Sequence, residues 1–261
     1  MTEGAIAEAG TVPHIAVRDL TMAFGSFVLM HDLNFTINRG DVFIIMGGSG
    51  SGKSTLLRHM IGLTEPARGE IFYDATNFTR SSGTERQQLL QRVGVLFQSG
   101  ALWSAMTLAE NIGLPLEEYT DLSPAEIRDV ASLKLALVGL KGFEDYYPSQ
   151  ISGGMQKRAG LARAMALDPR ILFFDEPSAG LDPITARLLD ELILELRDSL
   201  GTTVVVVTHD LASIFTIGNN SIYLDSDSRT ITASGPPNEL RAHAQDSKLR
   251  SFLTRGGTHN P

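Results

Sequence analysis

Four features are missing from this 261-residue sequence, and each absence narrows the possible function. It has no cysteine, which excludes disulfides and cysteine-ligated metal sites. No stretch approaches the ~20 apolar residues that span a bilayer, so any membrane role is expected to depend on a partner subunit. Residues 1–12 lack the apolar core of a secretory signal and are expected to form a loose, flexible tail. The net charge is -8 and the sequence has no basic stripe, which argues against nucleic acid as the main partner.

The most informative stretch present is a glycine-rich loop, GGSGSGKST, from Gly47 to Thr55. It fits the pattern G-x-x-x-x-G-K-[ST], in which backbone N–H groups and a helix N-terminus hold nucleotide phosphates. An apolar run at 41–46 precedes it and a helical pattern at 56–61 follows, which disfavours the alternative of a flexible linker. Lys53 is expected to reach the β- and γ-phosphates, and the Ser54 hydroxyl to ligate Mg²⁺. The predicted phosphate-binding residues are Gly47, Gly48, Ser49, Gly50, Ser51, Gly52, Lys53, Ser54 and Thr55.

A second motif supplies acids. The apolar run 171–174 ends in Asp175 and Glu176. An ATPase with a phosphate-binding loop needs a second strand that ends in an acid for Mg²⁺, and Asp175 fits that role. Glu176 fits a general base that polarises the attacking water. Two solvated acids at a strand end would be the alternative, but the phosphate-binding loop makes a nucleotide site the better interpretation.

The order of strand and helix patterns predicts an α/β fold. Short alternating or fully apolar runs predict strands, and the last two of them are expected to pair as a hairpin: 15–17, 33–37, 69–73, 93–97, 171–174, 203–207, 221–224 and 230–233. The fully apolar runs are typical of a sheet buried on both faces. From Pro236 onward we expect one short helix and a polar tail.

Residues 100–168 have a different, mainly helical pattern and are predicted to form a helical lobe inserted into the α/β core. Capping boxes are predicted at residues 107–110 and 123–126. The second box opens a helix whose expected apolar positions are Ile127, Val130, Leu133 and Leu137. Within the lobe, Ile151-Ser152-Gly153-Gly154-Met155 combines a helix cap with paired glycines, which taken alone fits a plain turn as well as an anion site.

Together these motifs resemble the ATP-binding subunits of ABC transporters, from about His14 to Ala233. That resemblance implies a P-loop NTPase core that is RecA-like, with a mostly parallel sheet flanked by helices, an antiparallel β subdomain and an inserted α-helical subdomain. The implied boundaries are an ATPase domain over 13–240, with its helical part at 100–168, and an extension over 241–261.

The resemblance also assigns roles to single residues. Phe24 matches the aromatic residue that stacks on adenine, Gln98 the glutamine that looks toward Mg²⁺, and His209 the histidine that contacts the γ-phosphate. Residues 151–155 match the signature LSGGQ, except that Ile replaces Leu and Met155 replaces Gln. Asp182 closes the segment 178–182, which matches the family's D-loop. Catalytic roles are thus expected for Lys53, Gln98, Glu176 and His209. The residues expected to bind Mg²⁺ are Ser54, Gln98 and Asp175. Besides the phosphate loop, the residues expected to contact ATP are Phe24, Gln98, Ser152, Gly153, Gly154, Met155 and Asp182.

A narrower resemblance is to the ATPases of Mce-associated phospholipid transport systems. The segments at 97–102, 111–116, 152–155 and 182–185 match that group, in which methionine at the last signature position is ordinary. The block 100–116 would face a membrane permease. Leu102 and Trp103 are expected either to dock that permease or to fill the core of the helical lobe.

These resemblances imply a mechanism and partners. ATP and Mg²⁺ would be bound by a head-to-tail homodimer, together with a permease dimer and an Mce-domain substrate-binding protein. The chain would lie peripherally on the cytoplasmic face of the inner membrane. An importer of amino acids or other small molecules is the alternative. A soluble ABC protein acting on ribosomes or DNA is disfavoured, because we find one cassette, no long coiled coil and no basic patch.

Overall fold

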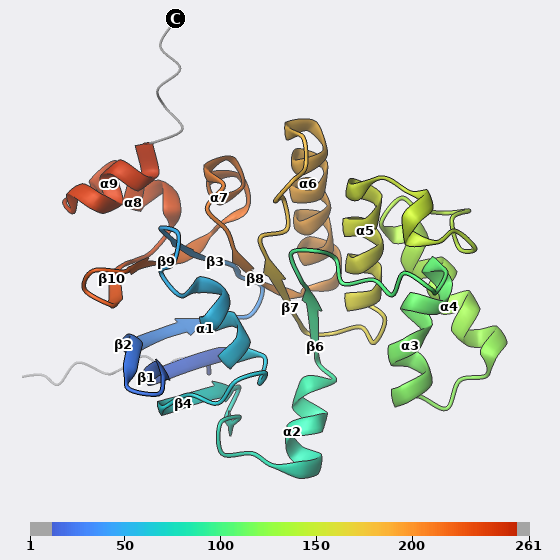
Figure 1. The fold of residues 1–261 in the computed structure, drawn as a ribbon, viewed down its shortest axis with the longest axis horizontal. Helices are drawn as coiled ribbons and strands as arrows, with labels where there is room; N and C mark the ends of the chain where they lie inside the picture. The colour runs from blue at the N-terminus through green and yellow to red at the C-terminus, as the bar shows by residue number, and fades with distance from the viewer. Residues whose placement is uncertain (1–11, 255–261) are drawn as a thin grey trace, which may run out of the picture.

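The computed structural model describes residues 12–254, so the expected tail at 1–12 lies almost wholly outside the described residues. Two sheets and a set of helices make up the fold (Figure 1). The strands are β1 (Ile15–Phe24), β2 (Phe27–Ile37), β3 (Val42–Gly47), β4 (Arg68–Tyr73), β5 (Thr76–Asn77), β6 (Val93–Leu96), β7 (Ile171–Asp175), β8 (Thr203–Val207), β9 (Asn220–Asp225) and β10 (Thr230–Ser234). The helices are α1 (Lys53–Met60), α2 (Gly83–Leu90), α3 (Leu108–Tyr119), α4 (Pro124–Leu137), the 3₁₀ turn η1 (Pro148–Gln150), α5 (Gly153–Ala164), α6 (Pro183–Leu200), α7 (Leu211–Ile217), α8 (Pro237–His243) and α9 (Ser247–Thr254).

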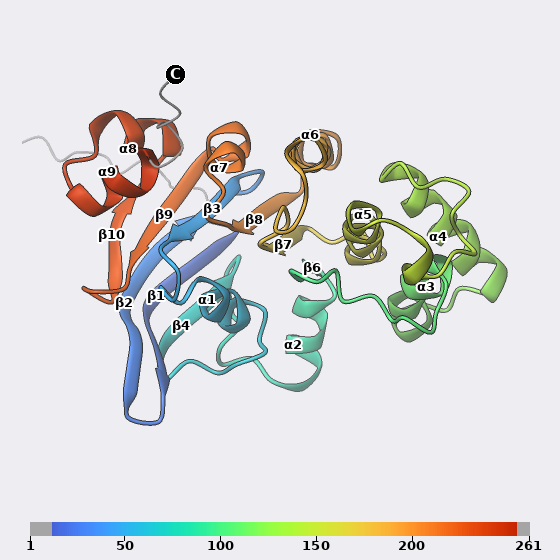
Figure 2. The same cartoon turned by 45° about the horizontal axis from the view of Figure 1, so that its top comes forward.

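The larger sheet has the strand order β10-β9-β3-β8-β7-β6 and is parallel except for β10. The smaller sheet has the order β2-β1-β4-β5 and is antiparallel. α1 lies between the two sheets, and the β1–β2 hairpin extends away from the larger one (Figures 1 and 2). The predicted fold class is therefore confirmed: a mostly parallel core flanked by helices, with an antiparallel subdomain.

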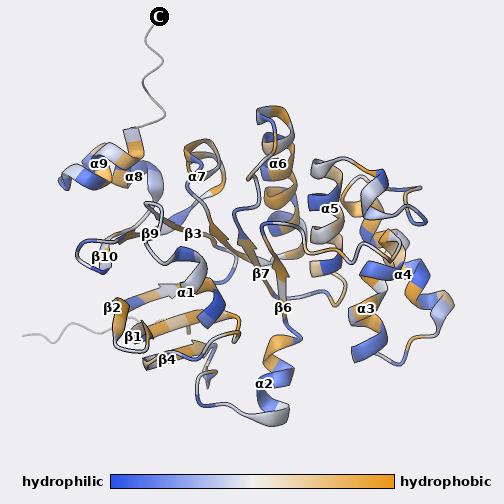
Figure 3. Cartoon of the chain, viewed as in Figure 1, coloured by the Kyte–Doolittle hydropathy of each residue, from blue (hydrophilic) through white to orange (hydrophobic). Residues whose placement is uncertain are grey.

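Two apolar clusters cover the two faces of the large sheet. Along β3, Val42, Ile44 and Met46 join the cluster that includes α5 to α7. Phe43 and Ile45 join the cluster beneath α1 and the small sheet. All five are essentially inaccessible, which confirms the prediction of strands buried on both faces. The strands of this sheet are accordingly the most hydrophobic part of Figure 3.

The helical lobe is inserted between two strands that are neighbours in the sheet, since β6 and β7 pair in parallel. α3 and α4 lie at the far end of the molecule from β10 (Figure 2). Both predicted capping boxes are present, at Thr107–Glu110 and at Ser123–Glu126. Backbone amides at the helix starts are thus satisfied locally, as the sequence pattern indicates.

The expected apolar stripe of α4 is wrong at two positions. Leu133 and Leu137 are 58% and 46% exposed. The buried face instead follows Ile127, Ala131, Lys134 and Leu135, which keeps the true helical spacing of three and four residues. A lysine can occupy that face because its amine pairs with the Asp168 carboxylate.

The expectation of one short helix after Pro236 is also wrong. A second helix, α9, follows α8, and its Leu249, Phe252 and Leu253 are buried against the core. The Phe252 ring packs 5.3 Å from that of Tyr223 on β9. The i, i+3, i+4 spacing of these three side chains is what makes this short segment an amphipathic helix. Among residues 12–254, no helix has the length and apolar character needed to cross a bilayer.

Candidate nucleotide site

The glycine-rich loop connects β3 to α1 at the carboxyl edge of the large sheet. The first residue of the loop must be glycine because another backbone segment lies too close: a Cβ on Gly47 would lie 2.6 Å from the Leu224 carbonyl oxygen. Its last glycine, Gly52, caps α1 in the left-handed conformation with φ +83°. The loop therefore turns tightly enough to direct backbone N–H groups and the α1 N-terminus toward one anion.

Lys53 begins α1 and bends back over this loop. Its Nζ donates to the carbonyl oxygens of Gly47 (3.0 Å) and Gly48 (2.9 Å). Burial lowers the pKa of Lys53, while the nearby Glu176 and Asp175 carboxylates oppose that shift. A desolvated ammonium in a ring of carbonyls and N–H groups suits a phosphate oxygen as its partner.

Ser54 and Asp175 meet from two separate elements. The Ser54 hydroxyl at the start of α1 donates to Asp175 Oδ1 at the end of β7, over 2.8 Å. Hydroxyl and carboxylate oxygens are ligands that Mg²⁺ accepts, and the ion usually takes its other ligands from phosphates and water. Among residues 12–254, no three or more His, Cys, Asp or Glu side chains are grouped so that they could hold a metal ion. Ser54 and Asp175 thus fit ATP with Mg²⁺, and the ion would supply charge neutralisation for the phosphates.

Glu176 and His209 form a direct pair. His209 Nδ1 lies 2.8 Å from Glu176 Oε1, and because a carboxylate only accepts, the ring proton is on Nδ1. Glu176 has φ +50°, unusual for a residue other than glycine, and its N–H donates to the Val207 carbonyl. The strained backbone and the histidine hold the carboxylate where it can accept a proton from water.

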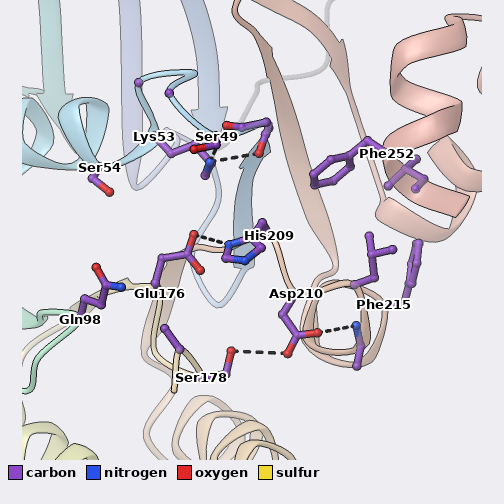
Figure 4. A pocket seen from close by; sticks show the side chains of 18 of the residues that line it. Ser49, Lys53, Ser54, Gln98, Glu176, Ser178, His209, Asp210, Phe215 and Phe252 are labelled. Atoms are coloured by element: carbon purple, nitrogen blue, oxygen red, sulfur yellow. Dashed lines mark hydrogen bonds and ion pairs between the residues drawn. The ribbon is translucent and has the colours of Figure 1, made fainter. Parts of the chain in front are cut away.

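Most of the predicted residues line one cavity of about 1430 Å³ (Figure 4). These are Gly47, Gly48, Ser49, Gly50, Gly52, Lys53, Ser54, Thr55, Gln98, Glu176 and His209. Ser51 is fully buried within the loop, and Asp175 lies behind Ser54. The cavity thus joins the phosphate loop to the predicted base and histidine.

The remaining predicted residues are elsewhere. Ser152 caps α5, accepting from the Met155 N–H, and Asp182 caps α6, accepting from Ile184 and Thr185. They and the glycines of the signature are absent from the cavity lining. A Cβ on Gly154 would lie 2.6 Å from Thr185 Cγ2, so the two caps pack together. Phe24 is 57% exposed at the β1–β2 hairpin and also lies outside the lining, to which β2 contributes Leu29.

Sequence reasoning missed several lining residues. Ser178 and Asp210 flank the Glu176–His209 pair, and Asp210 caps α7, a role that its position before Leu211 could have indicated. An apolar side of the cavity comes from Phe215 of α7 and from Phe252 and Leu253 of α9. Phe252 and Leu253 were missed because α9 itself was not expected.

A family profile described as "ABC transporter" matches residues 30–179. The chain belongs to the ABC transporter family. The geometry above agrees with this family, because the phosphate loop and the Glu176–His209 pair line one cavity.

The chain is similar to two groups of ATP-binding proteins. Proteins of Mycobacterium bovis and Mycobacterium tuberculosis named "Probable ribonucleotide transport ATP-binding protein mkl" are 45% identical over 92% of the chain. The chain spans 66% of their length, slightly under two thirds. The "Intermembrane phospholipid transport system ATP-binding protein MlaF" of Escherichia coli (strain K12) is 39% identical over 92% of this chain and 88% of its own.

Solved structures agree with the family. The dimeric post-hydrolysis ATP-binding cassette MJ0796 bound to ADP and Pi matches with a TM-score of 0.77 at 32% identity, covering 85% of this chain and 98% of its own. CbiO1 from Clostridium perfringens matches with a TM-score of 0.80 at 26% identity, and the match covers 93% of this chain and 94% of CbiO1.

Met155 offers a first test of the signature. Its side chain is half-buried against the apolar cluster beneath α5, rather than directed to solvent. Glutamine is similar in length and stands at this position in the signature LSGGQ, so Met155→Gln should leave ATPase activity within a small factor of wild type. Steady-state hydrolysis by both proteins, compared at equal folded concentration, measures this. A large gain in activity would show that methionine is a defect here and would weaken the assignment to the Mce-associated group.

Proposed function

We propose that this cassette energises movement of phospholipid, or another hydrophobic molecule, through a partner permease in a bacterial envelope. The observation that supports it most is the 39% identity to MlaF over 88% of that protein's length. The signature motif carries the same methionine that the Mce-associated resemblance leads us to expect. On this proposal an Mce-domain protein delivers or receives the molecule, and the cassette lies on the cytoplasmic face of the inner membrane.

The placement of the signature supports a homodimer. Ser152 to Met155 begin α5 on the surface, outside the cavity that holds Lys53 and Glu176. A second copy arranged head to tail would bring its signature to this cavity. Dimers are also the form in which the MJ0796 cassette was solved.

A cleft next to the helical lobe is the proposed permease site. It has a volume of about 530 Å³ and lies between α2, β6, α3 and the end of α5. Arg163 lines it and also donates to the carbonyl oxygens of Ala101 (2.7 Å) and Gly100 (3.1 Å). Movement in the cleft would thus reach Gln98 through the half-buried guanidinium of Arg163 and the short backbone segment that links Gly100 to Gln98.

Trp103 extends this surface. The residue is 63% exposed, so the alternative that it fills the core of the lobe is wrong, whereas Leu102 is half-buried against that core. Two hydrogen bonds between the Trp103 backbone and the buried Asn111 side chain fasten the loop to α3. Tyr119, the last residue of the same helix, is 43% exposed and lines the cleft.

Trp103→Ala combined with Tyr119→Ala should abolish co-purification with the permease while the subunit still folds and binds ATP. Exposed aromatic anchors commonly dominate interface energies, and truncating them removes little core. Pull-down from membranes beside thermal melting measures both effects, with Leu200→Ala, an equally exposed apolar position on α6, as the control. A double variant that melts normally and still retains the permease would exclude this surface.

The transported class is tested by affinity purification from native membrane, followed by mass spectrometry of proteins and lipids. Phospholipid, a permease and an Mce-domain protein should co-purify. The name of the mycobacterial relatives gives the second candidate, a ribonucleotide transporter. Enrichment of ribonucleotides without lipid, and a permease without an Mce-domain partner, would replace the first proposal with the second.

A further inference from the structure

A buried carboxylate on α6 has no role in the chemistry described above. Asp190 is 5% exposed and lies on the face of α6 that is otherwise formed by Leu189, Ile193 and Leu196. Its partner is Ser213 of α7, itself 1% exposed, whose hydroxyl donates to Asp190 Oδ2 over 2.8 Å. A buried polar pair between two helices is costly unless its geometry is well satisfied, so this contact holds α7 in one register against α6.

The same hydroxyl leads toward the nucleotide cavity. Ser213 Oγ is also 3.3 Å from Asp210 Oδ2, and Ser178 Oγ lies 3.4 Å from that oxygen. The other Asp210 oxygen caps α7 through the Ala212 N–H (3.0 Å), and the bond to Ser178 is drawn in Figure 4. Asp210 directly follows His209, and Ser178 lies two residues after Glu176. The network therefore ends at one residue next to His209 in the chain and at another two residues from Glu176.

One hydroxyl proton serves two carboxylates in this network. Ser213 can donate to only one of them at a time, and the shorter distance favours Asp190. Burial raises the pKa of Asp190 to about 6; the Ser213 bond opposes this and the Asp210 charge adds to it. The charged group that faces Asp190 from α7 is Asp210. The other two elements that pack on α6 are α5 and β8, and neither places a charged group near Asp190 among residues 12–254.

We propose that Asp190 and Ser213 are positioning residues for ATP hydrolysis, acting through Asp210 on His209 and on the segment that starts at Ser178. Asp190 anchors the Ser213 hydroxyl, the hydroxyl sets the side chain of Asp210, and Asp210 fixes the start of α7 directly after His209. Neither residue touches the cavity that holds the phosphates. This inference rests on the ATPase activity of the family and is independent of the molecule transported.

Steady-state kinetics of the full chain supply the first test. Ser213→Ala and Asp190→Ala should each lower kcat about fivefold to tenfold, with KM for ATP within about twofold, because the histidine loses its orientation while the phosphate loop is untouched. Asp190→Asn keeps an oxygen that can accept from Ser213 and should retain at least about half of kcat. The double variant Ser213→Ala, Asp190→Ala should fall no further than the worse single variant, since both act through one chain of contacts. Glu195→Gln, on the exposed side of α6, is the matched control.

One measurement without nucleotide separates positioning from mere packing, and a second reports the burial of the Asp190 carboxylate. The His209 imidazole resonance, assigned by its loss in His209→Gln, should shift in Ser213→Ala and stay in place in Glu195→Gln. Asp190→Asn should raise the urea midpoint more at pH 8 than at pH 5. The sign follows because ionising a carboxylate with a raised folded pKa disfavours the fold, and this penalty appears as pH rises through about 6.

Folded Ser213→Ala that keeps wild-type kcat and an unshifted His209 resonance would overturn the inference, even if its melting temperature fell. A loss of kcat of the same size in Glu195→Gln would overturn it as well. Should Asp190→Ala fail to fold, Ser213→Ala and Asp190→Asn decide the question by themselves. Lipid co-purification is expected to be unaffected in every variant, so failure here is distinguishable from failure of the transport proposal.

Discussion

Replacing Lys53 with alanine is expected to reduce ATP hydrolysis by about 100-fold or more and to weaken ATP binding. The Lys53 ammonium lies within 3.0 Å of two loop carbonyls and directly beside the α1 N-terminus. Desolvation strengthens any contact that it makes with a phosphate oxygen, because opposite charges attract more strongly at low dielectric. Alanine leaves the backbone donors in place but removes the one cationic side chain within the Gly47–Thr55 loop.

Binding of a fluorescent ATP analogue and steady-state hydrolysis in the assembled complex measure this prediction. Arg58→Ala is the control, because Arg58 is a cation on the exposed side of the same helix. It should change neither quantity by more than about twofold, as expected for a surface substitution. Wild-type turnover by Lys53→Ala would show that the loop does not hold the nucleotide phosphates.

Glu176→Gln should separate ATP binding from hydrolysis. Glutamine keeps an oxygen that can accept from His209 Nδ1, but it cannot take a proton from water. Hydrolysis is therefore expected to fall by roughly two orders of magnitude or more while ATP still binds. Asp175 is not expected to substitute as base, because it lies outside the cavity lining, with its Oδ1 accepting from the Ser54 hydroxyl.

The expected product of this substitution is an ATP-bound dimer that does not reopen. Size-exclusion chromatography with and without ATP detects it, and Glu191→Gln on the exposed face of α6 serves as the control. If the Glu176→Gln variant elutes only as a monomer with ATP, both alone and with the permease, the result would count against Glu176 as the base. Combining the substitution with Lys53→Ala should abolish the dimer, because the nucleotide that joins the two copies is no longer held.

Local motifs accounted for the features that depend on neighbouring residues. The turn at Gly47 and Gly52, the helix start at Lys53 and the two capping boxes each lie within a few residues of chain, so their physics is readable from spacing. The buried strands β7 and β8 were readable for a similar reason, since a strand covered on both faces needs unbroken apolar sequence. Asp175 and Glu176 were placed by the same strand, which ends at Asp175.

Partners far apart in the chain were not readable in this way. The stripe of α4 was wrong because the lobe accepts Lys134 in its core, and only the fold brings Asp168 to its amine. Trp103 was open to two interpretations, because apolar character alone does not separate a core residue from a docking residue. Its exposure is a property of how α3 and α5 pack beneath the loop.

By itself, then, the sequence determined the α/β class, the phosphate loop with Lys53 and Ser54, the acids Asp175 and Glu176 at the end of an apolar strand, and the family of the chain. Tertiary structure decided that Glu176 is paired with His209, that the signature lies outside its own cavity, that α9 closes the apolar side of the site, and that Asp190 reaches the site through Ser213. The division has one physical cause. Short-range geometry follows from the order of residues along the chain, whereas a hydrogen bond across 20 or 30 residues exists only after burial of the two apolar clusters has brought its donor and acceptor together.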